Sequence, residues 1–261
     1  MTLPAGFVPG IFSLEGRVAV VTGGASGLGE AMATGFAQAG AAVGVVDIDA
    51  ERAAAVCASI VEAGGTAAPF TADVTDSSAV DRVVAEVVAG LGGVDVLANS
   101  AGTAFRSPAE AFPEDRFDAI VSLNLKGTFL PCQRFGRHML EKGSGSIVNI
   151  ASIGGSIAYP HTVAYLATKG GVVQLTRALA LEWIGRVRVN AIAPTLFNTP
   201  MTAGLATTST VTTDFIQRRM LREDRLGEPH EIVGAAVFLA SDASSLVTGH
   251  VLPVDDGYLI A

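Results

Sequence analysis

A glycine-rich segment that joins a strand pattern to a helix pattern constrains the fold of this chain more than any other feature. After the apolar run at 18–21 comes Thr22-Gly23-Gly24-Ala25-Ser26-Gly27-Leu28-Gly29, and helical spacing begins with Ala31, Met32 and Phe36. Glycine suits this turn because a side chain would block the tight backbone, screen the N–H groups from an anion, or hold the helix off the sheet. Those N–H groups and the helix dipole attract phosphate. A merely flexible turn would not need the flanking strand and helix, so the segment predicts a dinucleotide site.

Short runs of Val, Ile and Ala recur along the chain and alternate with longer stretches of helical spacing. The predicted strands are 18–21, 42–46, 94–98, 147–150 and 187–192, and the predicted helices include 51–63, 79–91 and 163–183. Parallel strands need crossover helices, which cover both faces of the sheet. The pattern therefore predicts an α/β fold, a Rossmann-type doubly wound parallel sheet with helices on both faces. At 261 residues, the chain suits a single dinucleotide-binding catalytic domain over 1–261.

Charge and composition exclude several classes of protein. Lys and Arg total 17 against 25 Asp and Glu, so the chain lacks the electropositive surface that binds nucleic acid. Residues 1–12 contain no Lys or Arg and include two prolines, and the uncharged run 143–168 is interrupted by Asn149 and Pro160. We therefore expect a cytoplasmic protein without a membrane segment. Cys57 and Cys132 are the only cysteines and lie far apart, which predicts neither a disulfide framework nor a metal site.

Asp47 ends the second predicted strand, at the distance beyond the glycines where a carboxylate can accept hydrogen bonds from the adenosine ribose hydroxyls. A 2′-phosphate would be repelled there, so Asp47 predicts NAD as the cofactor. The alternative role for Asp47 is the N-cap of the next helix. Asp49, followed by Glu51 in the first helical turn, suits the cap better.

Tyr165 and Lys169 form the most specific pair in the sequence. With three tyrosines and three lysines in the chain, a Tyr four residues before a Lys is expected by chance only about 0.03 times. Positions i and i+4 share a helix face, which sets the ammonium beside the phenol. A neighbouring cation favours the phenolate, so the pair predicts a base active near neutral pH. The alternative is a Tyr and a Lys on a solvated helix surface.

Further motifs make the sequence resemble the short-chain dehydrogenase/reductase family from about Leu14 to Tyr258. Segment 22–29 resembles its cofactor motif, and Asp73-Val74 its adenine-contacting pair. Asn99-Ser100-Ala101-Gly102 resembles its strand-four motif, Asn124 its helix asparagine, Ser152 its catalytic serine, and Tyr165 with Lys169 its Tyr-x-x-x-Lys. Pro194-Thr195 departs from the usual Pro-Gly, and Asp255-Asp256-Gly257 from the usual Asp-Gly-Gly, whereas Thr199 matches the threonine that contacts the carboxamide.

The resemblance implies roles for individual side chains. Tyr165 would transfer the hydroxyl proton, Ser152 would bond the substrate oxygen, Lys169 would hold the nicotinamide ribose and lower the tyrosine pKa, and Asn124 would complete a water-linked proton relay to Lys169. The implied cofactor contacts are Gly23, Ser26, Gly27, Leu28, Gly29, Asp47, Asp73, Val74, Asn99, Ala101, Gly102, Tyr165, Lys169, Pro194 and Thr199.

The implied function is NAD-dependent interconversion of a secondary alcohol, such as a sugar alcohol or a small cyclic or aryl alcohol, and its ketone. One alternative is a 3-oxoacyl-thioester or other carbonyl reductase, which would usually prefer NADPH and basic residues near Ser26 or Asp47. The other is a non-catalytic NAD-binding sensor, against which the complete Ser, Tyr and Lys set argues.

Two expectations concern surfaces. The helices at 123–141 and 163–184 carry more apolar positions than one sheet face needs, which together with the resemblance predicts a homotetramer. Strand periodicity fails over 195–228, where apolar residues including Phe197 precede an Arg-rich stretch. We expect a mobile substrate lid there.

Overall fold

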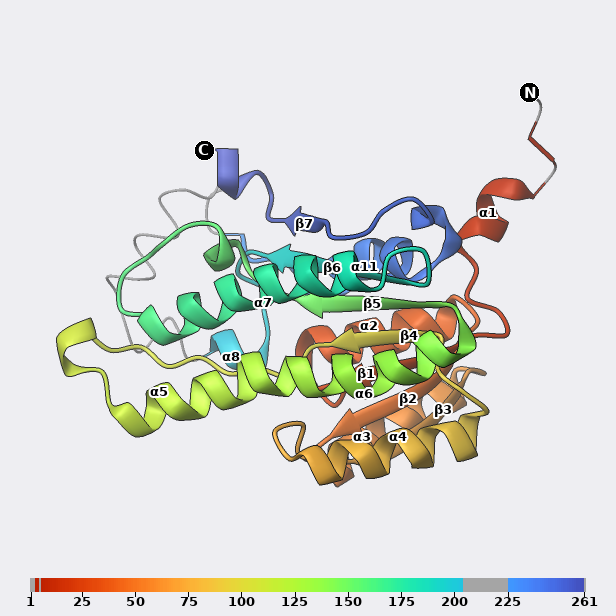
Figure 1. Ribbon diagram of the computed structural model, residues 1–261, viewed down its shortest axis with the longest axis horizontal. Helices are drawn as coiled ribbons and strands as arrows, with labels where there is room; N and C mark the ends of the chain where they lie inside the picture. Colours follow the sequence, from red (N-terminus) through yellow and green to blue (C-terminus); the bar gives the residue numbers. More distant parts are fainter. Residues whose placement is uncertain (1–2, 5, 204–224, 261) are drawn as a thin grey trace.

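Seven parallel strands form one sheet in a computed structural model, which describes residues 3–4, 6–203 and 225–260 (Figure 1). The spatial order is β3-β2-β1-β4-β5-β6-β7. The strands are β1 (Val18–Thr22), β2 (Ala42–Asp47), β3 (Thr66–Thr71), β4 (Val96–Asn99), β5 (Gly145–Ile150), β6 (Val187–Pro194) and β7 (Val251–Val254). Chain order reverses between β1 and β4, which pair directly from Ala19 with Val96 to Thr22 with Asn99. In such sheets, ligands bind beyond the carboxyl ends of the strands at this switch point.

Helices pack on both faces of the sheet, which confirms the predicted Rossmann-type fold. One face is covered by α2 (Gly27–Gln38), α3 (Ala50–Glu62) and α11 (Val233–Ala240). The other is covered by α4 (Ser77–Leu91), α6 (Gly127–Lys142) and α7 (Val163–Glu182). The remaining helices and helical turns are α1 (Phe7–Phe12), η1 (Ala109–Ala111), α5 (Glu114–Val121), η2 (Ser122–Lys126), η3 (Ile153–Gly155), α8 (Pro200–Ala203), η4 (Pro229–Ile232), η5 (Asp242–Ser244) and η6 (Tyr258–Ile260).

Strands β3 and β7 were not among the predicted strands. They form the two edges of the sheet, and they contain Pro69 and Pro253. An edge strand tolerates proline because one side of its backbone has no ladder partner. Both strands also lack the continuous burial of the central strands, so neither carries the run of Val and Ile that marked the others.

The predicted helix at 123–141 starts earlier and contains a π-helical turn. Helix α5 runs into η2, a π-helix, and then into α6. Asn124 lies fully buried in this turn, and its side chain hydrogen-bonds the backbone of Thr103 in both directions: Oδ1 accepts from the N–H at 2.8 Å and Nδ2 donates to the carbonyl at 2.9 Å. Wider turns of this kind often occur at functional sites.

The predicted lid at 195–228 is described only at its two ends, and residues 204–224 lie outside the described residues. Phe197 and Gly227 form a parallel β-bridge, and the Asn198 N–H donates to the Gly227 carbonyl at 2.7 Å. The ring of Phe197 is buried against Gly227, where an added Cβ would approach it to 2.9 Å. The two ends of the segment are therefore joined to each other.

A chain of buried amides and hydroxyls crosses the sheet from β1 to α7. The Thr22 hydroxyl donates to Asn99 Oδ1 at 3.3 Å, and Asn99 Nδ2 donates to Asn149 Oδ1 at 2.9 Å. Asn149 Nδ2 then donates to the Thr176 hydroxyl at 3.0 Å. All four side chains are buried, so each depends on its neighbours for hydrogen bonds.

We predict that Asn149→Ala lowers the free energy of unfolding by roughly 2–4 kcal/mol, because it removes one hydrogen-bond partner each from the buried side chains of Asn99 and Thr176, which keep only their bonds to Thr22 and Cys132 and to Val172. Denaturant unfolding followed by circular dichroism measures this. The control is Gln174→Ala on the exposed side of α7, expected to change stability by less than about 0.5 kcal/mol. Equal effects of the two variants would contradict a structural role for the polar chain.

Candidate active site

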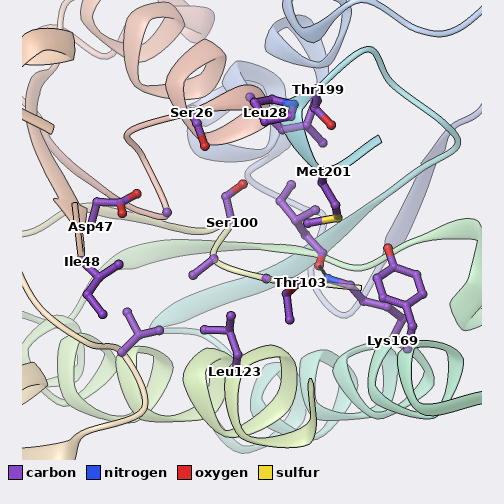
Figure 2. Close-up of a pocket in the computed structure, with 18 of the residues that line it drawn as sticks. Ser26, Leu28, Asp47, Ile48, Ser100, Thr103, Leu123, Lys169, Thr199 and Met201 are labelled. Atoms are coloured by element: carbon purple, nitrogen blue, oxygen red, sulfur yellow. Dashed lines mark hydrogen bonds between the residues drawn. The ribbon is translucent and has the colours of Figure 1, made fainter. Parts of the chain in front are cut away.

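A cleft of about 570 Å³ opens at the carboxyl ends of the central strands (Figure 2). This volume is typical of small-molecule sites. Asp47 and Ile48 lie at one end of the cleft, and Lys169 lies at the other. The lining includes the predicted residues Gly23, Ser26, Gly27, Leu28, Asp47, Asp73, Val74, Ala101, Gly102, Tyr165, Lys169, Pro194 and Thr199. Residues that the sequence predicted from scattered motifs therefore share one cavity.

Gly23 and Gly29 leave no room for a Cβ in the glycine turn, as the sequence predicted. Gly23 and Gly27 have φ of 64° and 55°, which L residues rarely adopt. A Cβ on Gly23 would lie 2.6 Å from the Ala101 Cα, and one on Gly29 would lie 2.0 Å from the Gly23 carbonyl oxygen. Helix α2 begins at Gly27, and the Ser26 side chain makes no capping hydrogen bond. The first N–H groups of α2 thus lack a side-chain cap beside the cleft, an arrangement that fits a pyrophosphate.

The carboxylate of Asp47 is held against this turn. Its Oδ2 accepts from the Ala25 N–H and its Oδ1 from the Asp49 N–H, both at 3.1 Å. Each carboxylate oxygen can accept a further hydrogen bond, so ribose hydroxyls can still be bound. Asp49 accepts from the Arg52 N–H at 3.1 Å and caps α3, which confirms the predicted capping role of Asp49.

Lys169 is buried at the far end of the cleft. Its Nζ donates to the Ile150 carbonyl at 2.7 Å and lies 5.7 Å from the centroid of the Tyr165 ring. Burial lowers the pKa of Lys169 to about 8. The ammonium has two further protons, so it can bind another acceptor while it keeps its bond to Ile150.

The pKa of Tyr165 differs from the expectation that its spacing from Lys169 suggested. Burial of the phenol raises its pKa above the usual value, while hydrogen bonding with Ser152 and the positive charge of Arg106 act in the opposite direction. The shared helix face is confirmed. In the free protein the pKa of Tyr165 moves up rather than toward neutral pH, because loss of hydration outweighs the hydrogen bond with Ser152 and the charge of Arg106.

Ser152, Asn124, Gly29 and Asn99 do not line the cleft among the described residues. Ser152 follows β5, and its buried hydroxyl accepts from the Gly154 N–H at 3.0 Å and hydrogen-bonds toward Tyr165. Asn124 is occupied by the Thr103 backbone and has no direct bond to Lys169. Gly29 packs against the Gly23 carbonyl beneath the turn, and Asn99 hydrogen-bonds within the buried polar chain. Their expected cofactor contacts stay predictions.

Thr195 stands where the family usually has a glycine. With Thr195 in this position, the end of β6 is still hydrogen-bonded to β7. Pro194 and Thr195 both line the cleft, and the Thr195 N–H donates to the Val254 carbonyl at 3.2 Å. Among the described residues, the buried Thr195 hydroxyl has no hydrogen-bond partner, so it adds an unpaired polar group to the wall of the cleft. A Cβ on Gly27 would lie 3.3 Å from the Thr199 methyl, so Thr199 lies directly against the glycine turn.

Sequence reasoning missed two polar side chains around Tyr165. Tyr159 is close enough to interact with both Ser152 and Tyr165, and burial raises its pKa. Arg106 carries a positive charge that acts on both phenols. One feature of the sequence could have drawn attention to Arg106. It is the only basic residue between Arg82 and Arg116, and it follows the strand-four motif closely.

Several known proteins are similar to this chain in sequence and in fold. The chain matches a family model described as enoyl-(acyl carrier protein) reductase over residues 23–259. It is 43% identical over 250 residues to the D-threitol dehydrogenase of Mycolicibacterium smegmatis, covering 95% of each chain. The NAD-dependent glycerol dehydrogenase of Listeria innocua is 42% identical over 250 residues, covering 95% of this chain and 96% of the relative.

Among solved structures, a gluconate 5-dehydrogenase from Burkholderia cenocepacia in complex with NADP and tartrate matches with a TM-score of 0.92 and 36% identity, covering 97% of this chain and 99% of that one. The chain belongs to the short-chain dehydrogenase/reductase family. It is an oxidoreductase that interconverts secondary alcohols and ketones with a nicotinamide cofactor. Within the described parts of this dehydrogenase, no helix is long and apolar enough to cross a membrane.

We predict that Tyr165 of the free enzyme stays mostly protonated at pH 10, the value at which an ordinary tyrosine is half ionised, because burial raises its pKa. The measurement is the phenolate absorbance of the wild type minus that of Tyr165→Phe during an alkaline titration. Arg106→Gln should move this difference to still higher pH, because it removes a charge that lowers the pKa. Half ionisation of Tyr165 below pH 10 would contradict this prediction. It would show that the pKa of Tyr165 is lowered, as its spacing from Lys169 suggested.

Proposed function

We propose that this protein is an NAD-dependent dehydrogenase of polyhydroxylated secondary alcohols, with Tyr165 as the group that removes the hydroxyl proton. The observation that carries the proposal is the cleft itself, which has a phenol and an ammonium at one end and a carboxylate, Asp47, at the other. Threitol, glycerol and gluconate appear in the names of the similar proteins, and all of them carry several hydroxyl groups.

The proposed chemistry divides between the cofactor and the chain. The bound nicotinamide supplies the hydride acceptor in alcohol oxidation. Tyr165 takes the hydroxyl proton as charge develops on oxygen, and the Ser152 hydroxyl donates a hydrogen bond to that oxygen. Lys169 holds the nicotinamide ribose with protons that its bond to Ile150 leaves free, and its charge favours the phenolate. In the reductive direction, Tyr165 returns the proton.

Asn124 has a supporting role in this proposal. It ties the π-helical turn to the backbone at Thr103, which lines the cleft. A Cβ on Gly102 would lie 3.3 Å from Asn124 Oδ1 and 3.9 Å from Lys169 Nζ, so both side chains surround the same glycine. This proximity supports the expected water-linked relay between Asn124 and Lys169.

NAD is favoured over NADP by the charge near the glycine turn. The carboxylate of Asp47 is fixed by two backbone N–H groups at the adenosine end of the cleft, where it would repel a 2′-phosphate. The glycerol dehydrogenase relative is named NAD-dependent, whereas the gluconate 5-dehydrogenase structure contains NADP.

The alternative with a specific observation in its favour is a reductase of acyl thioesters. The family model carries an enoyl-(acyl carrier protein) reductase description, but Ser26 and Asp47 place no basic side chain where such reductases would hold a 2′-phosphate. A non-catalytic NAD-binding sensor is disfavoured because Ser152, Tyr165 and Lys169 are all present and adjacent.

A homotetramer remains our proposal for the assembly. Large apolar side chains stay exposed on α5, on α6, at the carboxyl end of α7 and just beyond it, namely Phe117, Phe129, Leu181 and Ile184. Exposed apolar surface of this kind is typical of subunit contacts. The cytoplasmic location and the absence of nucleic acid binding stay predictions from sequence and charge.

Tyr165→Phe should lower kcat for alcohol oxidation by about 10²- to 10⁴-fold, because only the ionisable oxygen is removed. NAD reduction with threitol, glycerol and other secondary alcohols measures the rate. Thermal unfolding and NAD affinity serve as controls and should change little. Retention of more than about a tenth of kcat would show that another group is the base.

Asp47→Ala should raise NADP efficiency and lower NAD efficiency, so that the NAD preference falls by at least about tenfold, since one charged hydrogen-bonding group contributes about 1.5–3 kcal/mol. The matched control is Asp49→Ala, which removes an exposed carboxylate two residues away that caps α3 and does not line the cleft. Equal or better wild-type efficiency with NADP would overturn the NAD proposal.

A further inference from the structure

The side chain of Thr195 ends in a buried hydroxyl for which the described part of the chain offers no hydrogen-bond partner, although Thr195 lines the cleft. A buried hydroxyl of this kind has lost its hydrogen bonds to water and gained none in return. For this reason most buried polar groups in proteins have a partner. An unpaired hydroxyl in the wall of an enzyme's cleft points to a partner that arrives with a ligand.

The backbone on either side of the Thr195 side chain is held in place. The Thr195 N–H donates to the Val254 carbonyl of β7 at 3.2 Å, and the Leu196 carbonyl accepts from the Gly227 N–H at 2.9 Å. Rotation about the Cα–Cβ bond is then the main freedom left to the hydroxyl, which can occupy any of three staggered positions. No hydrogen bond within the described residues opposes this rotation. A ligand in the cleft can therefore draw the hydroxyl toward itself.

Thr195 lies beside the residues that are proposed to bind the reacting oxygen. Strand β6 stays hydrogen-bonded to the neighbouring strand β5 as far as the residue before Ser152. Leu196, which follows Thr195, packs against the apolar cluster that contains Ile153, which follows Ser152. Lys169 is bonded to the last residue of β5. The hydroxyl of Thr195 therefore belongs to the reacting end of the cleft.

We propose that the Thr195 hydroxyl binds a second hydroxyl of the substrate, next to the one that is oxidised, so that vicinal diols and polyols are preferred to simple secondary alcohols. This inference rests on the proposed dehydrogenase function and names the substrate group that the site recognises. A threonine hydroxyl suits an alcohol because each can donate one hydrogen bond and accept another. The position of Thr195 beside Ser152 puts this contact close to the reacting carbon.

The test uses alcohols that share a carbon skeleton and differ in their neighbouring hydroxyls. One series is glycerol, propane-1,2-diol and propan-2-ol, and the other is threitol, butane-2,3-diol and butan-2-ol. Wild type should show higher kcat/KM for the alcohols that have a neighbouring hydroxyl. Thr195→Val replaces the hydroxyl with a methyl group, so it should lower kcat/KM for these alcohols by about 5- to 50-fold. For propan-2-ol and butan-2-ol the change should be less than about twofold.

Two further variants separate recognition from general effects of the substitution. Thr195→Ser keeps the hydroxyl and removes only the methyl group, so it should retain the preference for vicinal diols. Thr66→Val is the matched control, because Thr66 is exposed on β3, at the edge of the sheet away from β6, and lies outside the lining of the cleft. It should behave as wild type with every alcohol.

Thermal unfolding of the free protein provides a readout apart from turnover. Thr195→Val should be at least as stable as wild type, because the hydroxyl that it removes has no partner among the described residues. A fall in Tm of more than about 2 °C would show that the hydroxyl is bonded inside the protein, and would overturn the inference.

The kinetic outcomes also distinguish this inference from the proposed function. If Thr195→Val lowers activity equally with all six alcohols and raises KM for NAD, the hydroxyl binds the cofactor instead of the substrate. If Thr195→Val matches wild type with every alcohol, the hydroxyl binds neither. In both cases recognition of a second hydroxyl is wrong while the dehydrogenase function stands. If wild type oxidises none of the six alcohols, the proposed function fails and this inference fails with it.

Discussion

The close approach of two backbone segments beneath the cleft is the constraint on which the rest of the structure depends. The turn after β1 runs so near Ala101, just beyond β4, that a single added carbon on Gly23 would collide with it. This contact is possible only because β1 and β4 are neighbours at the point where strand order reverses. It brings the free N–H groups of α2 to the same edge of the sheet as the loop that carries Thr103 and Arg106. Both halves of the site therefore depend on one contact between main chains.

The buried polar chain extends this constraint to the helix that carries the reactive side chains. Thr22 lies at the end of β1, and Thr176 lies on α7, two turns beyond Lys169. Asn99 and Asn149 connect them through the middle of the sheet. The nucleotide-binding turn and the tyrosine helix thus form one hydrogen-bonded unit. A polar core of this kind tolerates few substitutions, because each amide satisfies two neighbours.

Features that depend on spacing within one element could be predicted from the sequence, and features that depend on distant partners could not. The glycine turn, the placement of Asp47 at the end of β2, and the shared face of Tyr165 and Lys169 all follow from local periodicity. The edge strands could not be recognised, because Pro69 and Pro253 occupy positions that only an unpaired edge accepts. The π-helical turn at Asn124 depends on the backbone of Thr103, which is remote in sequence. The pKa of Tyr165 depends on burial by many segments.

The bridge between Phe197 and Gly227 has a consequence for how this enzyme can diverge. Phe197 and Gly227 pair with each other, so the two described ends of the segment between them lie side by side. Lengthening a closed loop costs little conformational entropy, only about 0.6 kcal/mol for each doubling. Insertions and deletions placed after Thr202, and so beyond the residues of this segment that line the cleft and contact the glycine turn, would therefore leave the sheet, that turn and α7 undisturbed. Descendants of one ancestral scaffold could exchange this segment as a cassette while they inherit the same hydride chemistry.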